Sequence, residues 1–238
     1  MLKKLKTLFP KESMWLYLMT LLSVVLILWG GITFKQEFYR ILPLFVSLLI
    51  GVLQSKANRY APLLGGLNCL LYTAVYVALG LYATAANTLL ISCPLQIATF
   101  IRWNKRPYKQ STQFRSLSAG QWCIVAVIFV GYYLVQHFLL SAANSSFRIL
   151  DNLSAVFSLF AAILPLLSFW EYSWFMLGFS VTNIVLQISM LATVPSQITY
   201  VVYACHCFIC MILQLINVNK IYKEQRAEKE VQQKKDCQ

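Results

Sequence analysis

The sequence predicts an all-α polytopic membrane protein with about eight transmembrane helices. Hydrophobic residues make up 59% of the 238 residues and charged residues 12%, a balance unlike that of ordinary soluble domains. Apolar runs of about 20 residues are typical of helices that cross a bilayer. Because no water is available there, the backbone must satisfy its own hydrogen bonds, which favours helices joined by short loops.

The apolar runs can be placed along the chain. We expect spans at 14–33, 41–54, 60–79, 83–102, 121–140, 150–169, 174–193 and 197–218. The second is the shortest and could begin earlier. The first follows a basic start like that of a signal peptide, but its apolar run is long and no clean cleavage site follows. We therefore expect it to be retained as a signal-anchor helix.

The basic residues predict the orientation of these spans. If the N-terminus is cytoplasmic, every Lys and Arg except Lys35, Arg40 and Arg148 falls on the cytoplasmic side. Such a bias places both termini in the cytoplasm and requires an even number of spans. The net charge of +12 is then mostly a signal of topology, so we do not expect the protein to bind nucleic acid.

Spans two to four and six to eight form two groups of three, separated by the fifth span. When the chain is shifted on itself by 115 residues, Asn68 meets Asn183 and Tyr72 meets Gln187. Both groups would begin outside and end inside, as parallel repeats do. The sequence thus predicts a 3+1+3 core with an extra N-terminal helix.

This organisation divides the chain into five parts. They are the basic start and extra helix at 1–40, the first repeat at 41–105, a basic cytoplasmic loop and linker helix at 106–148, the second repeat at 149–220, and a charged cytoplasmic tail at 221–238. The tail has mixed charge, and we interpret it as either a solvated helix extension or a disordered end.

The chemistry of the spans favours a passive carrier over an enzyme or a pump. Two-repeat membrane proteins are mostly transporters whose site lies at the repeat interface. No carboxylate falls in the middle of a span, and His206 alone is more typical of packing than of a proton relay. "CHCFIC" at 205–210 has no second group of ligands, so we expect no metal and no cofactor. The absence of a phosphate-binding glycine loop argues against ATP hydrolysis.

Amide and aromatic side chains are the candidate contacts for a cargo. Together they suit a planar, hydrogen-bonding and possibly cationic molecule. The alternatives are that buried amides bond helices to one another and that tryptophans at span ends form an interfacial belt. The candidate cargo-binding residues are Asn68, Tyr72, Asn87, Gln96, Trp103, Trp174, Asn183, Gln187, Tyr200 and Tyr203.

Residues 58–103 contain a G-x-x-N-x-x-x-Y core, a following "GLY", and a P-x-Q then W ending. These are Gly65, Asn68, Tyr72, Gly80 to Tyr82, Pro94, Gln96 and Trp103. Residues 150–188 contain a D-x-x-S…E-x-x-W pattern, and residues 200–225 are similar to the last helix of the same family. Over roughly 55–225 the chain resembles the PnuC family of vitamin and nucleoside transporters.

The resemblance implies a fold related to that of the SWEET sugar transporters, often assembled as a homotrimer. It implies facilitated diffusion of nicotinamide riboside, or of thiamine or deoxynucleosides, across a bacterial plasma membrane. A separate cytoplasmic kinase would trap the cargo by phosphorylation. Nicotinamide riboside is the leading candidate. A subunit that captures substrate for an ATP-driven partner, an intramembrane enzyme and a receptor-like protein without cargo are the alternatives from other classes.

The chain departs from the family at the start of the penultimate helix. Nicotinamide riboside carriers have W-x-x-W-x-x-x-N there. Anchored on Trp174, the motif would place Leu177 and Val181 at the second Trp and the Asn. The repeat alignment instead favours Asn183, about 200° around the helix from position 181. Both registers remain open from sequence alone.

Overall fold

The structure, a computed structural model, describes residues 11–78, 88–142 and 148–236. Its helices are α2 (Lys11–Thr33), α3 (Phe38–Ser55), α4 (Ala61–Ala78), the π-helical turn η1 (Thr88–Ser92), α6 (Cys93–Lys105), α7 (Ala119–Ala142), α8 (Arg148–Leu166), α9 (Tyr172–Leu191), the 3-10 turn η2 (Pro195–Gln197) and α10 (Ile198–Asp236). One small hairpin, β1 (Pro107–Tyr108) with β2 (Ser111–Thr112), interrupts them.

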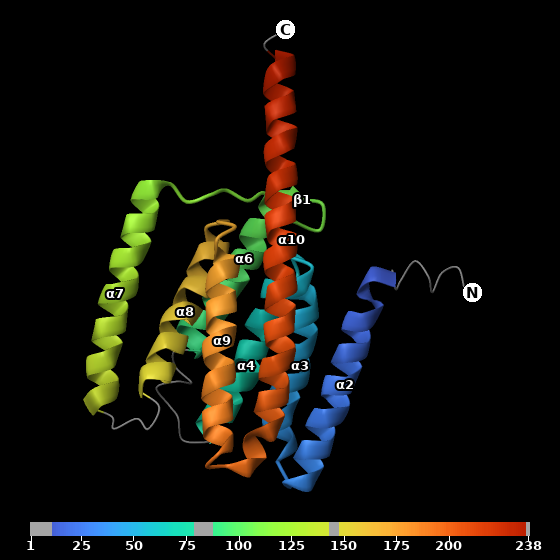
Figure 1. Cartoon of the computed structure of the whole chain (residues 1–238), viewed down its shortest axis with the longest axis vertical. Coiled ribbons are helices and arrows are strands. Elements are labelled where there is room, and N and C mark those ends of the chain that lie inside the picture. The colour runs from blue at the N-terminus through green and yellow to red at the C-terminus, as the bar shows by residue number, and fades with distance from the viewer. Residues whose placement is uncertain (1–10, 79–87, 143–147, 237–238) are drawn as a thin grey trace.

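Within the described residues, six helices close into a ring. α3 contacts α4, α4 contacts α6, α6 contacts α8, α8 contacts α9, α9 contacts α10, and α10 returns to α3. The ring therefore contains the two predicted three-helix groups, joined through α6–α8 on one side and α3–α10 on the other. Figure 1 shows these helices standing side by side.

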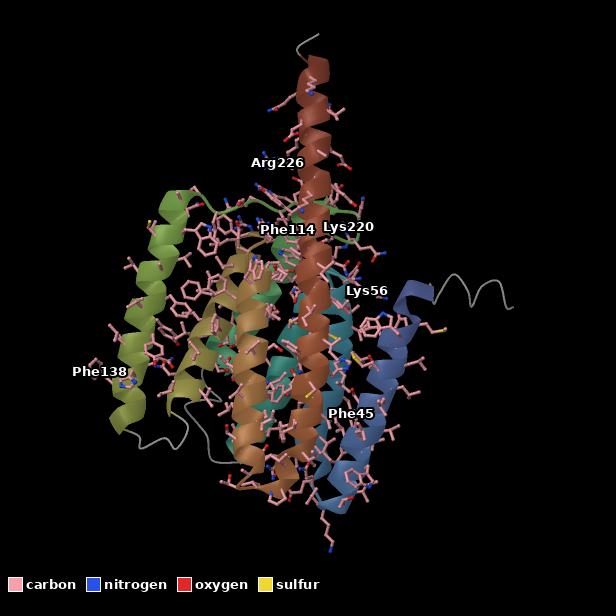
Figure 2. The ribbon with its side chains drawn as sticks, viewed as in Figure 1. Phe45, Lys56, Phe114, Phe138, Lys220 and Arg226 are labelled. Atoms are coloured by element: carbon pink, nitrogen blue, oxygen red, sulfur yellow. The ribbon has the colours of Figure 1, made fainter. Side chains whose placement is uncertain are left out.

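Two helices lie outside the ring. α2 packs on α10 and α3, and α7 packs mainly on α8. The outer surface of α7 is apolar and exposed, as at Phe138, which points away from the bundle in Figure 2. In a bilayer such a surface faces lipid tails, for which it is well suited. The structure thus separates an added helix and a linker helix from the ring, as the 3+1+3 prediction requires.

The predicted spans correspond to helices, with differences in extent. Among the described residues, five helices are long and apolar enough to cross a membrane: Met14–Thr33, Phe38–Ser55, Ala119–Phe138, Tyr172–Leu191 and a stretch of Pro195–Lys234. Shorter apolar stretches occupy Ala61–Val75 and Asn152–Leu166. The second span begins earlier than predicted, at Phe38, and residues 83–87 of the fourth lie outside the described residues.

α10 is the largest departure, because it continues as one helix to Asp236. Of the two interpretations of the tail, the helix extension is the one that the structure contains. Figure 1 shows this extension projecting beyond the ring, at the end where α2 begins. Lys56, Lys220 and Arg226 lie at or beyond this same end in Figure 2, so these three residues share one side, as the positive-inside pattern predicts for them.

Residues 106–118, which we call the strap, cross this end of the ring, which we call the strap end. The backbone N–H of Arg59, after α3, donates to the Gln110 carbonyl at 2.9 Å. Between α8 and α9, Arg115 N–H donates to the Ser168 carbonyl at 3.0 Å, and Trp170 N–H donates to the Arg115 carbonyl at 3.1 Å. The strap thereby ties the first three-helix group to the second.

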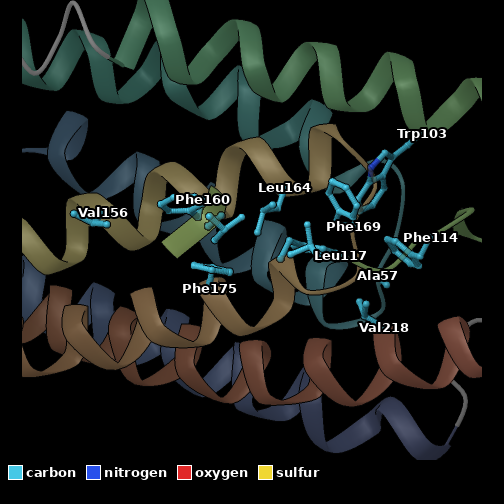
Figure 3. Close-up of a cluster of buried hydrophobic side chains, with 13 residues drawn as sticks. Ala57, Trp103, Phe114, Leu117, Val156, Phe160, Leu164, Phe169, Phe175 and Val218 are labelled. Atoms are coloured by element: carbon cyan, nitrogen blue, oxygen red, sulfur yellow. The ribbon is translucent and has the colours of Figure 1, made fainter. Parts of the chain in front are cut away.

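The largest cluster of buried apolar side chains lies beneath the strap, between α6, α8 and α9. Figure 3 shows Trp103 and Phe114 at one end of this cluster, with Ala57 and Val218 nearby. Ala57 has a positive φ of 48° as the chain leaves α3. The apolar side chains of the cluster, among them Trp103, Phe114 and Leu117, fill the ring at the strap end.

Candidate functional site

A partly open cavity of about 260 Å³, which we call the central cavity, lies between the ring helices. Each of the six ring helices contributes to its lining. The polar lining residues are Ser47, Gln54, Asn68, Tyr72, Ser92, Gln96, Ser158 and Tyr203, and Cys69 and Cys207 add two thiols. Among the described residues that line it, none carries a formal charge. The cavity is therefore a neutral, hydrogen-bonding compartment at the junction of the two three-helix groups.

Asn68 is fixed by α3 but keeps one open group. Its Nδ2 donates to Ser47 Oγ at 2.7 Å and lies 3.4 Å from the Pro43 carbonyl oxygen. The Tyr72 hydroxyl lies 3.4 Å from the same Ser47 oxygen. Asn68 Oδ1 is buried and has no hydrogen-bond partner among the described residues. The amide therefore holds α4 to α3 with its nitrogen and leaves an acceptor for another molecule.

Gly65 explains how Gln96 reaches the cavity from α6. A Cβ atom at position 65 would lie 3.2 Å from Gln96 Cδ and 3.2 Å from its Oε1. Only a residue without a side chain lets this amide lie against α4 without displacement. The G-x-x-N spacing thus places Asn68 and the space for Gln96 one turn apart on the same face of α4.

On α9, the cavity is lined by Met176 and Phe179 rather than by tryptophan. Trp174 is 51% exposed and Val181 is 45% exposed, so both lie on the outward face. Asn183 falls four residues after Phe179 and seven after Met176, on the inward face. The order Met176-x-x-Phe179-x-x-x-Asn183 therefore has the spacing of W-x-x-W-x-x-x-N. The structure favours this register over the one anchored on Trp174.

The structure brings four of the predicted residues together in the central cavity: Asn68, Tyr72, Gln96 and Tyr203. Trp174, Asn183, Gln187 and Tyr200 lie outside its lining. Although Asn183 has the spacing of the inward face of α9, it is not among the residues that line the cavity with Asn68, contrary to the prediction of the repeat alignment. Its Oδ1 accepts a hydrogen bond from Gln187 Nε2 at 3.3 Å. Asn87 lies outside the described residues.

Several lining residues escaped the sequence analysis. Ser47 and Gln54 of α3 and Met176 and Phe179 of α9 are examples. On α10, Cys207 and Met211 follow Tyr203 at intervals of four residues, and this spacing could have identified them once Tyr203 was placed. Met176 and Phe179 are apolar residues in an apolar span, so their own chemistry did not mark them as cavity residues.

A second, much smaller pocket of about 20 Å³ adjoins the cavity at the strap end. Four residues line both spaces: Gln54, Gln96, Ala161 and Met176. Trp103 and Tyr172 line only the small pocket, and both are almost fully buried. Since the Trp103 indole is 3% exposed, the alternative of an interfacial belt is wrong for this residue.

Hydrogen bonds and aromatic contacts close this small pocket. Trp103 Nε1 donates to the Pro165 carbonyl at 2.8 Å, and Gln214 Nε2 donates to the Tyr172 hydroxyl at 3.0 Å. Phe114 of the strap packs on Trp103 and Tyr172, with ring centroids 5.8 and 6.0 Å away. The strap thus covers the rings of Trp103 and Tyr172, which we call the aromatic plug, at this end of the cavity.

His206 has the packing role expected for it. Its Nδ1 lies 3.3 Å from Ser23 Oγ of α2, and its Nε2 lies 3.4 Å from Cys210 Sγ. It is not among the residues that line the cavity. In the described residues, no group of three or more His, Cys, Asp or Glu side chains could hold a metal ion.

Comparison with known proteins identifies the family. The model of the nicotinamide mononucleotide transporter family matches residues 37–214, well over half of the chain. The chain belongs to this family. The crystal structure of the vitamin B3 transporter PnuC is similar in fold, with a TM-score of 0.69, 21% sequence identity, and coverage of 91% of this chain and 94% of that chain. Among individually curated proteins, none matches this sequence closely enough to count as a relative.

Membership of the nicotinamide mononucleotide transporter family makes this all-α, multi-pass membrane protein a transporter rather than an enzyme. The resemblance to PnuC drawn from sequence is confirmed. The matched region begins one residue before α3 and ends within α10, so it spans the whole ring. α2 and the extension of α10 lie outside it.

Proposed function

We propose that this transporter carries a nucleoside-like vitamin precursor through the central cavity, with nicotinamide riboside as the leading cargo. The neutral lining carries this proposal. A phosphate group is strongly anionic and needs Arg, Lys or a cluster of N–H donors when it leaves water. None of the described lining residues offers a positive charge. The family is named after a mononucleotide, but this chemistry favours the nucleoside without its phosphate.

The polar groups of the cavity suit such a cargo. Asn68 Oδ1 would accept a hydrogen bond from an amide N–H or a sugar hydroxyl, and Gln96 could serve as donor or acceptor. The rings of Tyr72, Tyr203 and Phe179 would contact a flat or cationic ring, for which cation–π attraction is worth about 2 kcal/mol when water is excluded. At about 260 Å³ the cavity lies near the lower limit of small-molecule sites.

The same neutrality supports facilitated diffusion and trapping. No carboxylate lines the cavity among the described residues, so no proton or cation relay is evident there. The gathering of basic residues supports a cytoplasmic strap end and cytoplasmic termini in a bacterial plasma membrane. A kinase on that side would add a phosphate that the neutral cavity does not accept, which would prevent return. A homotrimer, suggested by the family resemblance, belongs to this proposal as well.

Thiamine or a deoxynucleoside is the alternative cargo within the same family. Met176 and Phe179 occupy the positions at which the motif has two tryptophans, so ring stacking would be weaker than a tryptophan pair provides. A non-transporting, receptor-like protein is the alternative from a different class, and it predicts binding without flux.

Uptake by proteoliposomes tests the proposal. Vesicles containing the purified protein would be given radiolabelled nicotinamide riboside, nicotinamide mononucleotide, thiamine and deoxynucleosides in parallel. We expect saturable uptake of nicotinamide riboside without an ion gradient, and none of the mononucleotide. Uptake of thiamine or a deoxynucleoside alone would reassign the cargo. Binding without any flux would support the receptor-like alternative, and uptake of the mononucleotide would contradict the argument from neutrality.

A further inference from the structure

The helices that line the central cavity also line the small pocket at the strap end. On α10, Tyr203, Cys207 and Met211 line the cavity, and Gln214 follows on the same face, about 4.5 Å further along the helix than Met211. On α6, Gln96 lines both spaces and Trp103 lines only the small pocket. The small pocket is therefore a continuation of the cavity toward the strap end.

Gln214 is a buried amide in the lining of this pocket. Its side chain is 2% exposed, and its Nε2 donates to the Tyr172 hydroxyl at 3.0 Å. This bond holds the amide nitrogen against the Tyr172 hydroxyl and leaves the carbonyl oxygen for another partner. That oxygen, Oε1, has no hydrogen-bond partner among the described residues. A buried acceptor without a partner is costly in a membrane interior, so its retention needs a reason.

The same chemistry recurs at two levels of the path. Asn68 Oδ1 is an unpartnered acceptor in the central cavity, and Gln214 Oε1 is an unpartnered acceptor in the small pocket. In both residues the amide nitrogen is held by a neighbouring helix, through Ser47 for Asn68 and through Tyr172 for Gln214. Gln54 and Gln96 line both spaces and lie between these two levels.

We infer that Gln214 is a transit station for the cargo, by which we mean a second, transient binding point on its path. There the Gln214 carbonyl accepts a hydrogen bond from the donor group of the cargo that the Asn68 carbonyl binds in the central cavity. This inference rests on the proposed function. The ligand is an uncharged hydrogen-bond donor, an amide N–H or a hydroxyl, and not a phosphate. A pocket of about 20 Å³ has room for one water and not for a cargo. The station is thus closed in this structure and forms as Trp103, Tyr172 and Phe114 move apart.

The test separates binding from transport. Gln214→Met removes the acceptor while keeping a side chain of similar length, and Asn68→Ala serves as the comparison in the central cavity. Nicotinamide riboside is the probe, with Kd measured by calorimetry on the purified protein and the uptake rate in proteoliposomes. We expect Gln214→Met to leave Kd within about twofold and to lower the uptake rate about tenfold or more, whereas Asn68→Ala raises Kd.

Two further measurements keep the inference falsifiable. Gln214→Asn retains a carbonyl and should keep more of the uptake rate than Gln214→Met, which covers the case in which the Met variant does not fold. An unchanged uptake rate in Gln214→Met would mean that the carbonyl holds only water, and the inference would fail. An equal loss of binding and uptake would also overturn it, because Gln214 would then belong to a single site or to the fold. If the wild-type protein transports no member of the cargo panel, the proposed function is wrong, and the inference about Gln214, which rests on it, is wrong as well.

Discussion

Gln225 and Phe114 are joined by a hydrogen bond across 111 residues of chain. Gln225 Oε1, on the extension of α10, accepts the backbone N–H of Phe114 at 2.8 Å, and Gln225 Nε2 donates to the Thr112 carbonyl at 2.8 Å. Phe114 in turn covers Trp103 and Tyr172 at the strap end of the path. The extension of α10, to which the sequence analysis assigned no role, therefore holds in place the part of the strap that covers the aromatic plug.

Replacing Gln225 should loosen this cover. Gln225→Ala leaves a buried N–H and a buried carbonyl without partners, at about 1–3 kcal/mol for each group that water does not reach. We expect a lower melting temperature in detergent and faster proteolysis within the strap. Gln232→Ala, an exposed position on the same extension, is the matched control and should change neither. Equal stability of the two variants would show that the strap is held by other contacts.

Glu171 anchors the other end of the strap. It is 3% exposed, and its Oε1 accepts from Ser116 Oγ at 2.6 Å and from Leu117 N–H at 2.8 Å. Glu171→Ala removes this acceptor and should destabilise the protein by about 1–3 kcal/mol in chemical denaturation. Glu171→Gln keeps a carbonyl acceptor, so most of the stability should remain. If Gln is as damaging as Ala, the charge rather than the acceptor is what the strap requires.

The ion pair between Lys109 and Glu224 should matter much less. Its atoms lie 2.6 Å apart, but the side chains are 59% and 35% exposed, so solvent screens the attraction. Their hydrogen bond lowers the pKa of Glu224 and raises the pKa of Lys109. The stabilisation is lost as the pH falls through the lowered pKa of Glu224, or rises through the raised pKa of Lys109.

At about pH 7 both groups are therefore charged and the pair contributes in full. Lys109→Ala should lower the melting temperature slightly at that pH, by less than Gln225→Ala does, and the difference should shrink as the pH falls through the lowered pKa of Glu224. A loss that persists unchanged in acid would assign it to packing of the lysine stem.

The spans could be predicted from sequence because membrane thickness fixes helix length, and composition alone records it. The face that each helix turns toward the cavity could not be predicted from sequence. In a soluble helix polar residues mark the outer face, but a lipid-facing surface is as apolar as the interior. Because the two faces look alike in sequence, Trp174 was predicted as a cargo contact although it faces outward. Met176 and Phe179, which line the cavity, were not predicted. Asn68 and Gln96 were identifiable because an amide inside a span needs a partner.

The strap was hidden for a different reason. Its contacts join backbone groups to side chains more than 50 residues away, as between Leu117 and Glu171. Backbone donors and acceptors occur at nearly every residue, so no pattern in the sequence records which of them are used. The sequence predicted a basic loop between the two repeats, and only the fold reveals that it crosses the end of the cavity.

Gly65 offers a test of the position of Gln96. In Gly65→Ala the new Cβ atom would come within 3.2 Å of the Gln96 amide and push it aside. We expect the Kd for nicotinamide riboside to rise several-fold, the equivalent of about 1 kcal/mol for one weakened hydrogen bond. Gly131→Ala is the control, since a Cβ atom there meets nothing within 4 Å. An unaffected Kd in Gly65→Ala would exclude Gln96 as a cargo contact.

The register of α9 can be decided by a variant that gains function. Phe179→Trp places an indole at the position of the second tryptophan in W-x-x-W-x-x-x-N and should tighten binding of nicotinamide riboside, because a larger aromatic face contacts its ring. Phe179→Ala should weaken binding. Trp174→Ala, on the outward face of the same helix, should leave the Kd unchanged in the same calorimetric titration. The opposite pattern, a loss in Trp174→Ala with no effect at Phe179, would show that the outward face of α9 contributes the cargo contact and that the register anchored on Trp174 is correct.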